Sequence, residues 1–348
     1  MSIEIEQLKQ AIDTNDIVAV KAMMTRNPTL HSAPLGYGKD GPLTWVAECR
    51  VPWESPSPAR LALAAWMLGH GSDVHQGGDG PLMRAALNGY RIPMMELLVS
   101  HGADVNAEWH GEYPIIFAAC EAVDPRALKW LLDHGANPNC DRPHRAHQGT
   151  ALDYLIGSYV RSLELSACID ILLDAGGRTK YDVPVVLELL RGRLDGVKEH
   201  LRADPALVTA RFSELDCGAT GGRLLTLVGA TLLHVAAEYR NLEGIRLLLN
   251  QGADVNGRAK IDEAGVGGQT AIFHAVTQLD DGGVPVVQLL VERGADLSIR
   301  AKLPGHYERP REVVECTPLG YALRFQDVPT RSDKARTVTL LRERGAVE

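Results

Sequence analysis

The stretch that decides the fold begins with Thr231-Leu232-Leu233-His234-Val235-Ala236-Ala237 and ends with Leu247-Leu248-Leu249 and Gly252-Ala253-Asp254-Val255-Asn256. A glycine directly after a leucine run is typical of the residue that follows a helix end, where a positive φ costs glycine little. Asp254, two residues further on, is a type that hydrogen-bonds its own backbone and starts a turn. The small Ala236-Ala237 pair lets a neighbouring helix approach closely. We therefore predict two short helices followed by a turn.

Both phrases return along the chain at a fixed distance from each other. The clearest copies of the second phrase are Leu97-Leu98-Val99 with Gly102-Ala103-Asp104-Val105-Asn106, Trp130-Leu131-Leu132 with Gly135-Ala136-Asn137-Pro138-Asn139, and Leu289-Leu290-Val291 with Gly294-Ala295-Asp296. Weaker copies are Gly71-Ser72-Asp73-Val74, Gly176-Gly177 and Gly345-Ala346. Such repetition indicates a solenoid, because one helix pair cannot bury its apolar face alone and must stack on its neighbours.

The two phrases resemble the ankyrin repeat, in which a Thr-Pro-Leu-His-x-Ala-Ala helix precedes a Leu-Leu helix and a Gly-Ala-Asp turn. The resemblance covers nearly the whole chain and is closest to the degenerate arrays of bacterial ankyrin proteins. It implies an all-α ankyrin-repeat solenoid of stacked helix–turn–helix units with extended hairpin loops. The predicted units, about nine in number, are residues 1–30, 41–75, 79–106, 111–140, 148–178, 182–207, 229–257, 268–298 and 315–348.

Two parts of the array match each other. Ala47-Glu48-Cys49-Arg50 resembles Ala237-Glu238-Tyr239-Arg240, and Thr150-Ala151-Leu152-Asp153-Tyr154 resembles Thr317-Pro318-Leu319-Gly320-Tyr321. We infer two ankyrin blocks that descend from one duplicated array, residues 1–180 with about five repeats and 181–348 with about four. The blocks are predicted to form one continuous solenoid.

Composition and charge indicate the cellular location of the protein and the kinds of partner it binds. The formal net charge is −8, with most of the negative excess in the first block, and no basic stripe is present, so we predict that the protein does not bind nucleic acid. Residues 1–6 do not resemble a signal peptide, and no apolar run is long enough to span a membrane. Six scattered cysteines without a Cys-x-x-Cys motif indicate a reducing, cytoplasmic location. Polar residues over 331–344 predict a capped last unit and a monomer.

The resemblance also implies which residues face a partner. In ankyrin proteins the residue before Ala-Ala and the two after it face the concave side, and a Trp-, Tyr- and Arg-rich set on one face is notable in a chain with 5% aromatic residues. Trp109 adds a second set at a loop tip, where an aromatic ring between charged neighbours predicts an exposed contact residue. The predicted partner-binding residues are Trp45, Glu48, Arg50, Arg84, Trp109, His110, Tyr113, Phe117, Glu121, Tyr154, Glu238, Tyr239, Arg240, His274, Tyr321 and Arg324.

Other patterns receive a structural interpretation. Residues 36–41 match Gly-x-Gly-x-x-Gly but follow a helix pair rather than a strand, so we interpret them as a turn. His70, His101 and His134 each precede a repeat glycine, where a helix C-terminus favours histidine. Repeats roughly 10 Å apart cannot bring these three side chains to one metal. His234 resembles the family's structural histidine, which ties turn backbone groups together.

One loop and three insertions leave alternatives open. Asp141, His144 and His147 are interpreted as part of a solvated loop, with a metal site, or an anion site on the neighbouring arginines, as the alternatives. We predict no metal, no cofactor and no catalytic residues, and a non-catalytic scaffold that binds a protein through its concave groove and loop tips. The alternative is a small-molecule-binding protein or atypical enzyme, with a pocket between the concave face and an inserted loop at 31–58, 208–228 or 298–316.

Overall fold

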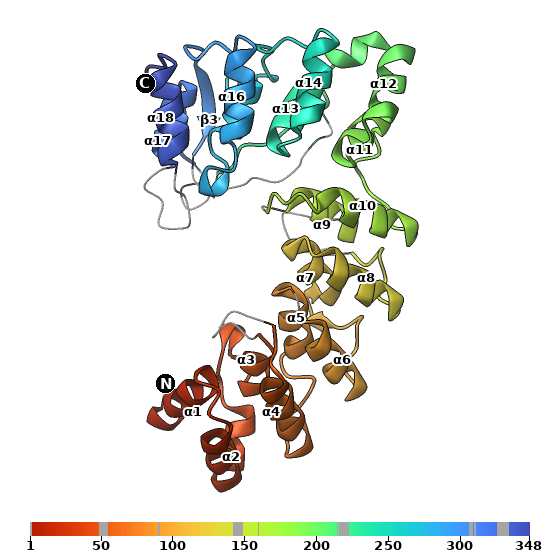
Figure 1. Ribbon diagram of the computed structural model, residues 1–348, viewed down its shortest axis with the longest axis vertical. Helices are drawn as coiled ribbons and strands as arrows, with labels where there is room; N and C mark the ends of the chain where they lie inside the picture. The colour runs from red at the N-terminus through yellow and green to blue at the C-terminus, as the bar shows by residue number, and fades with distance from the viewer. Residues whose placement is uncertain are drawn as a thin grey trace. The chain divides into compact units, whose positions relative to one another are not determined.

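The computed structural model describes residues 2–48, 55–89, 91–141, 149–158, 160–213, 215, 223–305, 309, 311–325 and 334–348. Within these residues the chain forms eighteen α-helices in nine consecutive pairs, together with two small two-stranded sheets (Figure 1). Each of the predicted units contains one helix pair. The predicted all-α solenoid of helix–turn–helix units with hairpin loops is therefore confirmed.

The helix pairs follow one another along the described residues. The first five are α1 (Ile3–Asp13) with α2 (Ile17–Arg26), α3 (Pro42–Glu48) with α4 (Pro58–Gly69), α5 (Gly80–Leu87) with α6 (Ile92–Ser100), α7 (Ile115–Ala122) with α8 (Pro125–Asp133), and α9 (Ala151–Gly157) with α10 (Leu165–Asp174). The last four are α11 (Pro184–Leu190) with α12 (Leu194–Ala203), α13 (Leu232–Glu238) with α14 (Leu242–Asn250), α15 (Ala271–Ala275) with α16 (Val284–Glu292), and α17 (Pro318–Arg324) with α18 (Ala335–Glu343). Short 3-10 helices are η1 (Pro28–Ser32), η2 (Tyr37–Lys39), η3 (Pro205–Val208) and η4 (Leu279–Asp281).

Contacts divide the chain into two compact units. Unit 1 comprises residues 1–155 and 167–179, and unit 2 comprises residues 156–166 and 180–348. The loop between α9 and α10 therefore packs with unit 2. The descent of two blocks from one duplicated array stays a prediction.

The repeat glycines end the second helices in the predicted way. Gly102 and Gly252 have φ values of 102° and 92°, a region that favours glycine. The aspartates that follow start the next turn, since Oδ1 of Asp104 accepts the backbone N–H of Asn106 at 2.8 Å and Oδ1 of Asp254 accepts that of Asn256 at 2.9 Å.

The asparagine that closes each full phrase links one repeat to the next, a role the sequence analysis did not identify. Asn106 donates from Nδ2 to the carbonyl of Gly135 at 2.9 Å and accepts the N–H of Asn137 at 2.8 Å. Asn256 does the same with the carbonyl of Gly294, at 3.1 Å, and the N–H of Asp296, at 2.7 Å. These side chains hold the turns of neighbouring repeats in register.

Stacked first helices and leucines of the second helices form the core. Helix α3 contacts α5, α5 contacts α7, and α13 contacts α15. Ala85 and Ala118 are fully buried at these contacts, where a small side chain allows close approach. Leu98 in α6 and Leu248 in α14 are also fully buried, and each such leucine contributes about 1.5–3 kcal/mol through the apolar surface it removes from water.

Hairpins project between consecutive repeats. Strands β1 (Glu108–Trp109) and β2 (Tyr113–Pro114) pair antiparallel in unit 1, and β3 (Ala301–Pro304) pairs with β4 (Val313–Cys316) in unit 2. In unit 2, backbone bridges join Gly267 to Ile261 and to Lys302, so neighbouring hairpins are linked. Across the described ranges, no helix combines the length and apolar character needed to cross a membrane.

Candidate functional site

The β1–β2 hairpin carries Trp109 and His110, and one buried carboxylate fixes both. Trp109 Nε1 donates to Oδ2 of Asp40 at 2.8 Å, and His110 Nε2 lies 2.8 Å from Oδ1 of the same carboxylate. The Asp40 side chain is 1% exposed, whereas that of His110 is 47% exposed and Trp109 is half-buried. Trp109 is thus not the fully exposed residue that was expected, because Asp40 draws its indole inward. The two rings keep a fixed orientation while part of their surface faces water.

The glycine-rich loop 36–41 allows this approach. Gly36 and Gly38 have φ values of 87° and 76°, so the segment is a tight turn. The prediction that residues 36–41 form a turn is therefore confirmed. A Cβ atom on Gly38 would lie 3.0 Å from the indole of Trp109, closer than an ordinary contact. A side chain at this position would therefore push the indole away from Asp40.

Further aromatic rings continue from Trp109 along the first helices. Tyr113 meets Trp109 at right angles with ring centroids 6.2 Å apart, and Phe117 stacks on Tyr154 with centroids 4.8 Å apart. Glu121 Oε2 accepts the hydroxyl of Tyr113 at 2.8 Å and that of Tyr154 at 2.7 Å. Burial raises the pKa of Tyr113 well above its usual value, so its hydroxyl stays a donor. We call Trp109, Tyr113, Phe117, Tyr154 and Glu121 the aromatic ledge.

The ledge is only partly open to solvent. Phe117 is fully buried and Tyr113 is 7% exposed, whereas Tyr154 and Glu121 are half-exposed. The expectation that Phe117 faces a partner is therefore wrong, because its ring is enclosed by Tyr113 and Tyr154. The accessible surface comes from the other members and from His110.

The predicted contact residues of the second and third repeats lie mainly between helices. Trp45 is half-exposed and donates from Nε1 to Oδ1 of Asp13 at 2.7 Å, with Nζ of Lys9 at 4.9 Å from its ring centroid. Glu48 is 0% exposed and Arg84 is 4% exposed, and Nη1 of Arg84 lies 3.9 Å from Oε1 of Glu48. Glu48 and Arg84 therefore do not face an open groove, because they form an ion pair between α3 and α5.

Glu238 is the centre of a buried charged cluster in unit 2. Its Oε1 accepts from Nε and Nη2 of Arg161 at 3.2 and 3.0 Å. Its Oε2 accepts from Nη2 of Arg223 at 2.7 Å and from Nδ1 of His274 at 2.7 Å. No side chain of the four is more than 4% exposed. A buried charge requires such partners, and so Glu238 and His274 are packing residues rather than the groove residues that were expected.

Electrostatics keep this glutamate ionised. Burial by itself would raise the pKa of Glu238, but Arg223, Arg161 and the hydrogen bond from His274 outweigh burial and hold the pKa below its usual value. Arg161 and Arg223 were not predicted, because nothing local in the sequence marks them: Arg161 lies 77 residues from its glutamate. The one available signal was the matching Ala-Glu pair at Ala47-Glu48 and Ala237-Glu238.

The remaining predicted contact residues of unit 2 differ in exposure. Tyr321 is fully buried, and burial raises the pKa of its hydroxyl, so its prediction as a contact residue is wrong. Tyr239 and Arg240 are half-exposed, and Arg324 is exposed and ion-paired with Glu312. These three keep surface that a partner can contact.

Histidines adopt the structural roles that were predicted. Nδ1 of His70, His101 and His134 lies 2.7, 2.8 and 2.7 Å from the carbonyl oxygen four residues earlier, at the end of each second helix. His234 Nδ1 accepts the N–H of Thr231 at 3.2 Å, and its Nε2 donates to the carbonyl of Gln269 at 3.0 Å. Burial lowers the pKa of His234 to about 3, which keeps it neutral in this role.

Several predictions fall outside the described residues. Arg50 is one of them, and so are His144 and His147 of the loop that was considered for a metal or an anion. Among the residues that the structure describes, no group of three or more His, Cys, Asp or Glu side chains is arranged to hold a metal ion. The insertions at 31–58, 208–228 and 298–316 are described only in part.

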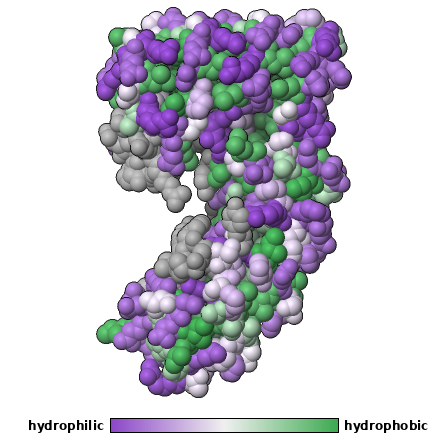
Figure 2. Space-filling model, in the orientation of Figure 1, coloured by the Kyte–Doolittle hydropathy of each residue, from purple (hydrophilic) through white to green (hydrophobic). Residues whose placement is uncertain are grey.

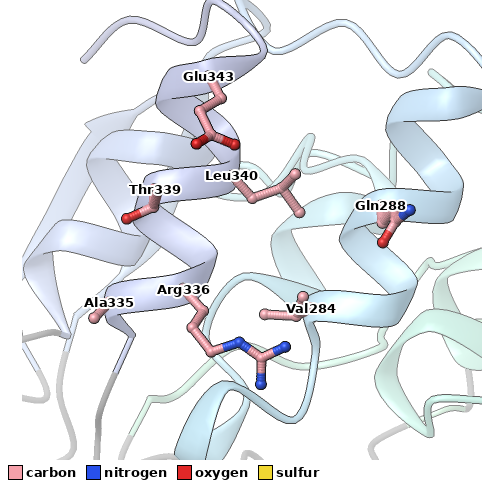
Figure 3. Close-up of a pocket in the computed structure, with 7 residues that line it drawn as sticks. All are labelled: Val284, Gln288, Ala335, Arg336, Thr339, Leu340 and Glu343. Carbon is pink, nitrogen blue, oxygen red and sulfur yellow. The ribbon is translucent and has the colours of Figure 1, made fainter.

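A groove of about 310 Å³ lies between α16 and α18, on second helices rather than beneath an inserted loop. Its lining residues are Val284, Gln288, Ala335, Arg336, Thr339, Leu340 and Glu343. Leu340 points from α18 into the space between the helices, with Glu343 and Arg336 toward its two ends (Figure 3). Hydrophilic and hydrophobic residues are intermixed over the helices of unit 2 in the view of Figure 2. Because the groove is lined by second helices, it does not lie where the pocket beneath an inserted loop was predicted.

The comparison with protein families agrees with the repeat architecture. The protein-family description "Ankyrin repeats (3 copies)" matches residues 59–142 and 190–301, together more than half of the chain. The ankyrin repeat domain of human ASB11 is a similar solved structure, with 18% identity and a TM-score of 0.36, over 88% of this chain and 99% of that one. A comparison with curated proteins finds no match. Ankyrin repeats generally mediate protein binding, and the chain belongs to the ankyrin repeat family.

Proposed function

We propose that the protein is a non-catalytic ankyrin-repeat scaffold that binds a protein partner through the aromatic ledge and the tip of the β1–β2 hairpin. The observation that carries the proposal is the pair Trp109 and His110, which Asp40 fixes in orientation while both keep solvent-accessible surface. A side chain that is already ordered loses little conformational freedom on binding. Tryptophan and tyrosine are also the residue types that most often dominate binding energy.

Charge indicates the chemistry of the partner segment. Glu108 and Glu112 are exposed on either side of the hairpin tip, and Asp104 is exposed just before it. Glu121 adds a half-exposed carboxylate beside Tyr154. A lysine or arginine of the partner would meet carboxylates and aromatic faces together, and both attract a cation. The proposed partner therefore presents a basic side chain in an exposed segment.

The test is affinity capture from the source lysate followed by measurement of affinity for the captured protein. Trp109→Ala combined with Tyr154→Ala is expected to abolish capture, and Trp109→Ala alone to weaken binding by about 2 kcal/mol, roughly thirtyfold. Trp130→Ala is the matched control, because Trp130 is a half-exposed tryptophan on second helix α8, stacked on His134 at 3.8 Å. It should bind like the wild type.

Two results would overturn the proposal. Equal capture by the wild type and the double variant would place the binding surface elsewhere. Co-purification of a small molecule without a protein, lost in the double variant, would favour the ligand-binding alternative.

A further inference from the structure

The loop between α9 and α10 lies between two buried helix-end residues, Ile156 of α9 and Leu165 of α10, and its residues 160–164 carry the polar side chains that reach unit 2. Tyr239 donates its hydroxyl to the carbonyl of Ile156 at 2.7 Å, and the guanidinium of Arg161 lies 4.4 Å from the Tyr239 ring centroid. Leu163, at the middle of the loop, is 90% exposed and adds no apolar anchor. Within residues 160–164 the buried attachment is Arg161, whose side chain is 4% exposed and reaches Glu238.

Glu238 binds this arginine together with two other groups. Arg223 comes from the segment before α13, and His274 comes from α15 of the next repeat. His234 on α13 faces the His274 ring edge to face at 5.7 Å. Tyr321 on α17 lies within electrostatic reach of Glu238 and Arg223, and Lys334 donates to the carbonyl of Gln278 just beyond α15. Within the described part of unit 2, these are the charged and titratable groups near the imidazole of His274.

The imidazole of His274 fits this site only in its neutral form. Its Nδ1–H donates to Glu238, whereas Nε2 is buried and has no hydrogen-bond partner among the described residues. A second proton would place an N–H without an acceptor in the protein interior, which is costly. It would also add a positive charge beside the guanidinium groups of Arg161 and Arg223.

We propose that Arg161, Glu238 and His274 form an acid-sensitive latch, which holds loop residues 160–164 on unit 2 near neutral pH and releases them when His274 is protonated. Departure of the loop removes one guanidinium from the neighbourhood of the imidazolium and admits water to the site. The latch is independent of the partner-binding function proposed above.

The direction of the pH dependence follows from the two states. Burial lowers the pKa of His274 in the closed state, the bond to Glu238 opposes this, and Arg223 and Arg161 lower it further. Departure of Arg161 and entry of water bring this pKa back toward its ordinary value of 6.5 in the open state. Closure is therefore fully favoured above the pKa of the open state and weakens as the pH falls below it. Glu238, whose pKa is held below its ordinary 4.5, does not titrate between these two values.

Cleavage of the full-length protein by a glutamate-specific protease tests the latch. Glu164 is exposed inside the loop but must leave the surface to enter a protease, whereas Glu243 within α14 reports unfolding of unit 2. Arg161→Gln removes the anchor and gives the cleavage rate of the released loop at each pH. Circular dichroism confirms that each variant is folded. The rate of cleavage after Glu164 in the wild type is divided by the rate in Arg161→Gln at the same pH. This ratio measures opening of the loop, because the pH dependence of the protease itself cancels.

We expect this ratio to rise by about tenfold per pH unit below pH 6.5, the effect of one linked proton, with no cleavage after Glu243. His274→Asn keeps a donor toward Glu238 but cannot be protonated, so its ratio should stay flat. His200→Asn in α12, a half-exposed histidine of the same unit, is the matched control and should behave as the wild type. A wild-type ratio that does not change with pH, the same pH profile in His274→Asn, or Arg161→Gln cleaved no faster than the wild type near pH 7.5 would each overturn the latch.

Discussion

At the scale of single residues, a glycine can be required by its backbone conformation even where there is space for a side chain. A Cβ on Gly102 would meet no atom within 4 Å, and yet its φ is 102°. Gly69, near the end of α4, has equally open surroundings and no positive φ. The two positions therefore separate the cost of the backbone conformation from that of crowding.

We expect Gly102→Ala to destabilise the protein by about 1–2 kcal/mol, because alanine in the left-handed region brings its Cβ too close to the following carbonyl oxygen. Gly69→Ala should be neutral or stabilise by up to about 1 kcal/mol, because alanine reduces the freedom of the unfolded chain. Urea denaturation of the two variants beside the wild type measures both effects. A loss of stability in Gly69→Ala as large as that in Gly102→Ala would contradict this explanation.

The same scale shows what the sequence could and could not reveal. The helix pairs were predictable because Ala-Ala, the leucine run and the glycine act within one repeat. Glu48 and Glu238 were misread as groove residues because their environment depends on partners in other repeats, such as Arg161 and His274. The orientation of Trp109 depends on Asp40, 69 residues earlier, and no local pattern encodes that pairing.

At the scale of elements, the β1–β2 hairpin is attached by side chains more than by its two short strands. Its register consists of the pairs Glu108–Pro114 and Trp109–Tyr113, and a two-stranded hairpin of this length is marginal on its own. Asp40 accepts a hydrogen bond from the indole of Trp109 and lies 2.8 Å from Nε2 of His110, and the backbone N–H of His110 donates to the carbonyl of Gly77 at 2.9 Å.

Asp40→Ala should therefore loosen the hairpin while the helices remain folded. We expect amide exchange over residues 107–114 to accelerate by about tenfold or more, the equivalent of losing a hydrogen bond to a charged group of about 1.5–3 kcal/mol. Hydrogen exchange with mass spectrometry measures this. Asp13→Ala, which removes the acceptor of Trp45 in the same way, is the control and should leave the hairpin unchanged. Unaltered exchange over 107–114 in Asp40→Ala would show that the hairpin does not depend on this carboxylate.

At the scale of the whole molecule, contacts gather in two units, although one helix pair follows another along the described sequence. In a solenoid each repeat contacts only its neighbours, so cooperativity depends on how well each interface couples two repeats. The number of denaturation transitions therefore shows whether the nine helix pairs unfold as one cooperative array or as two.

Leu248→Ala tests this, because Leu248 is fully buried in α14 of unit 2. We expect a loss of about 2–5 kcal/mol that appears in one of two denaturation transitions and leaves the other in place. Leu98→Ala, the corresponding leucine of α6 in unit 1, should shift the opposite transition. Equal shifts of a single transition by both variants would support the continuous solenoid instead.

The asparagine links between repeats have a consequence for the chemical ageing of the molecule. Asn256 precedes Gly257, and asparagine before glycine is the combination in which the side-chain amide is lost most readily by deamidation. Replacement of Nδ2 by oxygen would set two acceptors against each other across the 3.1 Å that now separate Nδ2 from the carbonyl of Gly294. One slow covalent event at this position would thus turn an attraction between the seventh and eighth repeats into a repulsion.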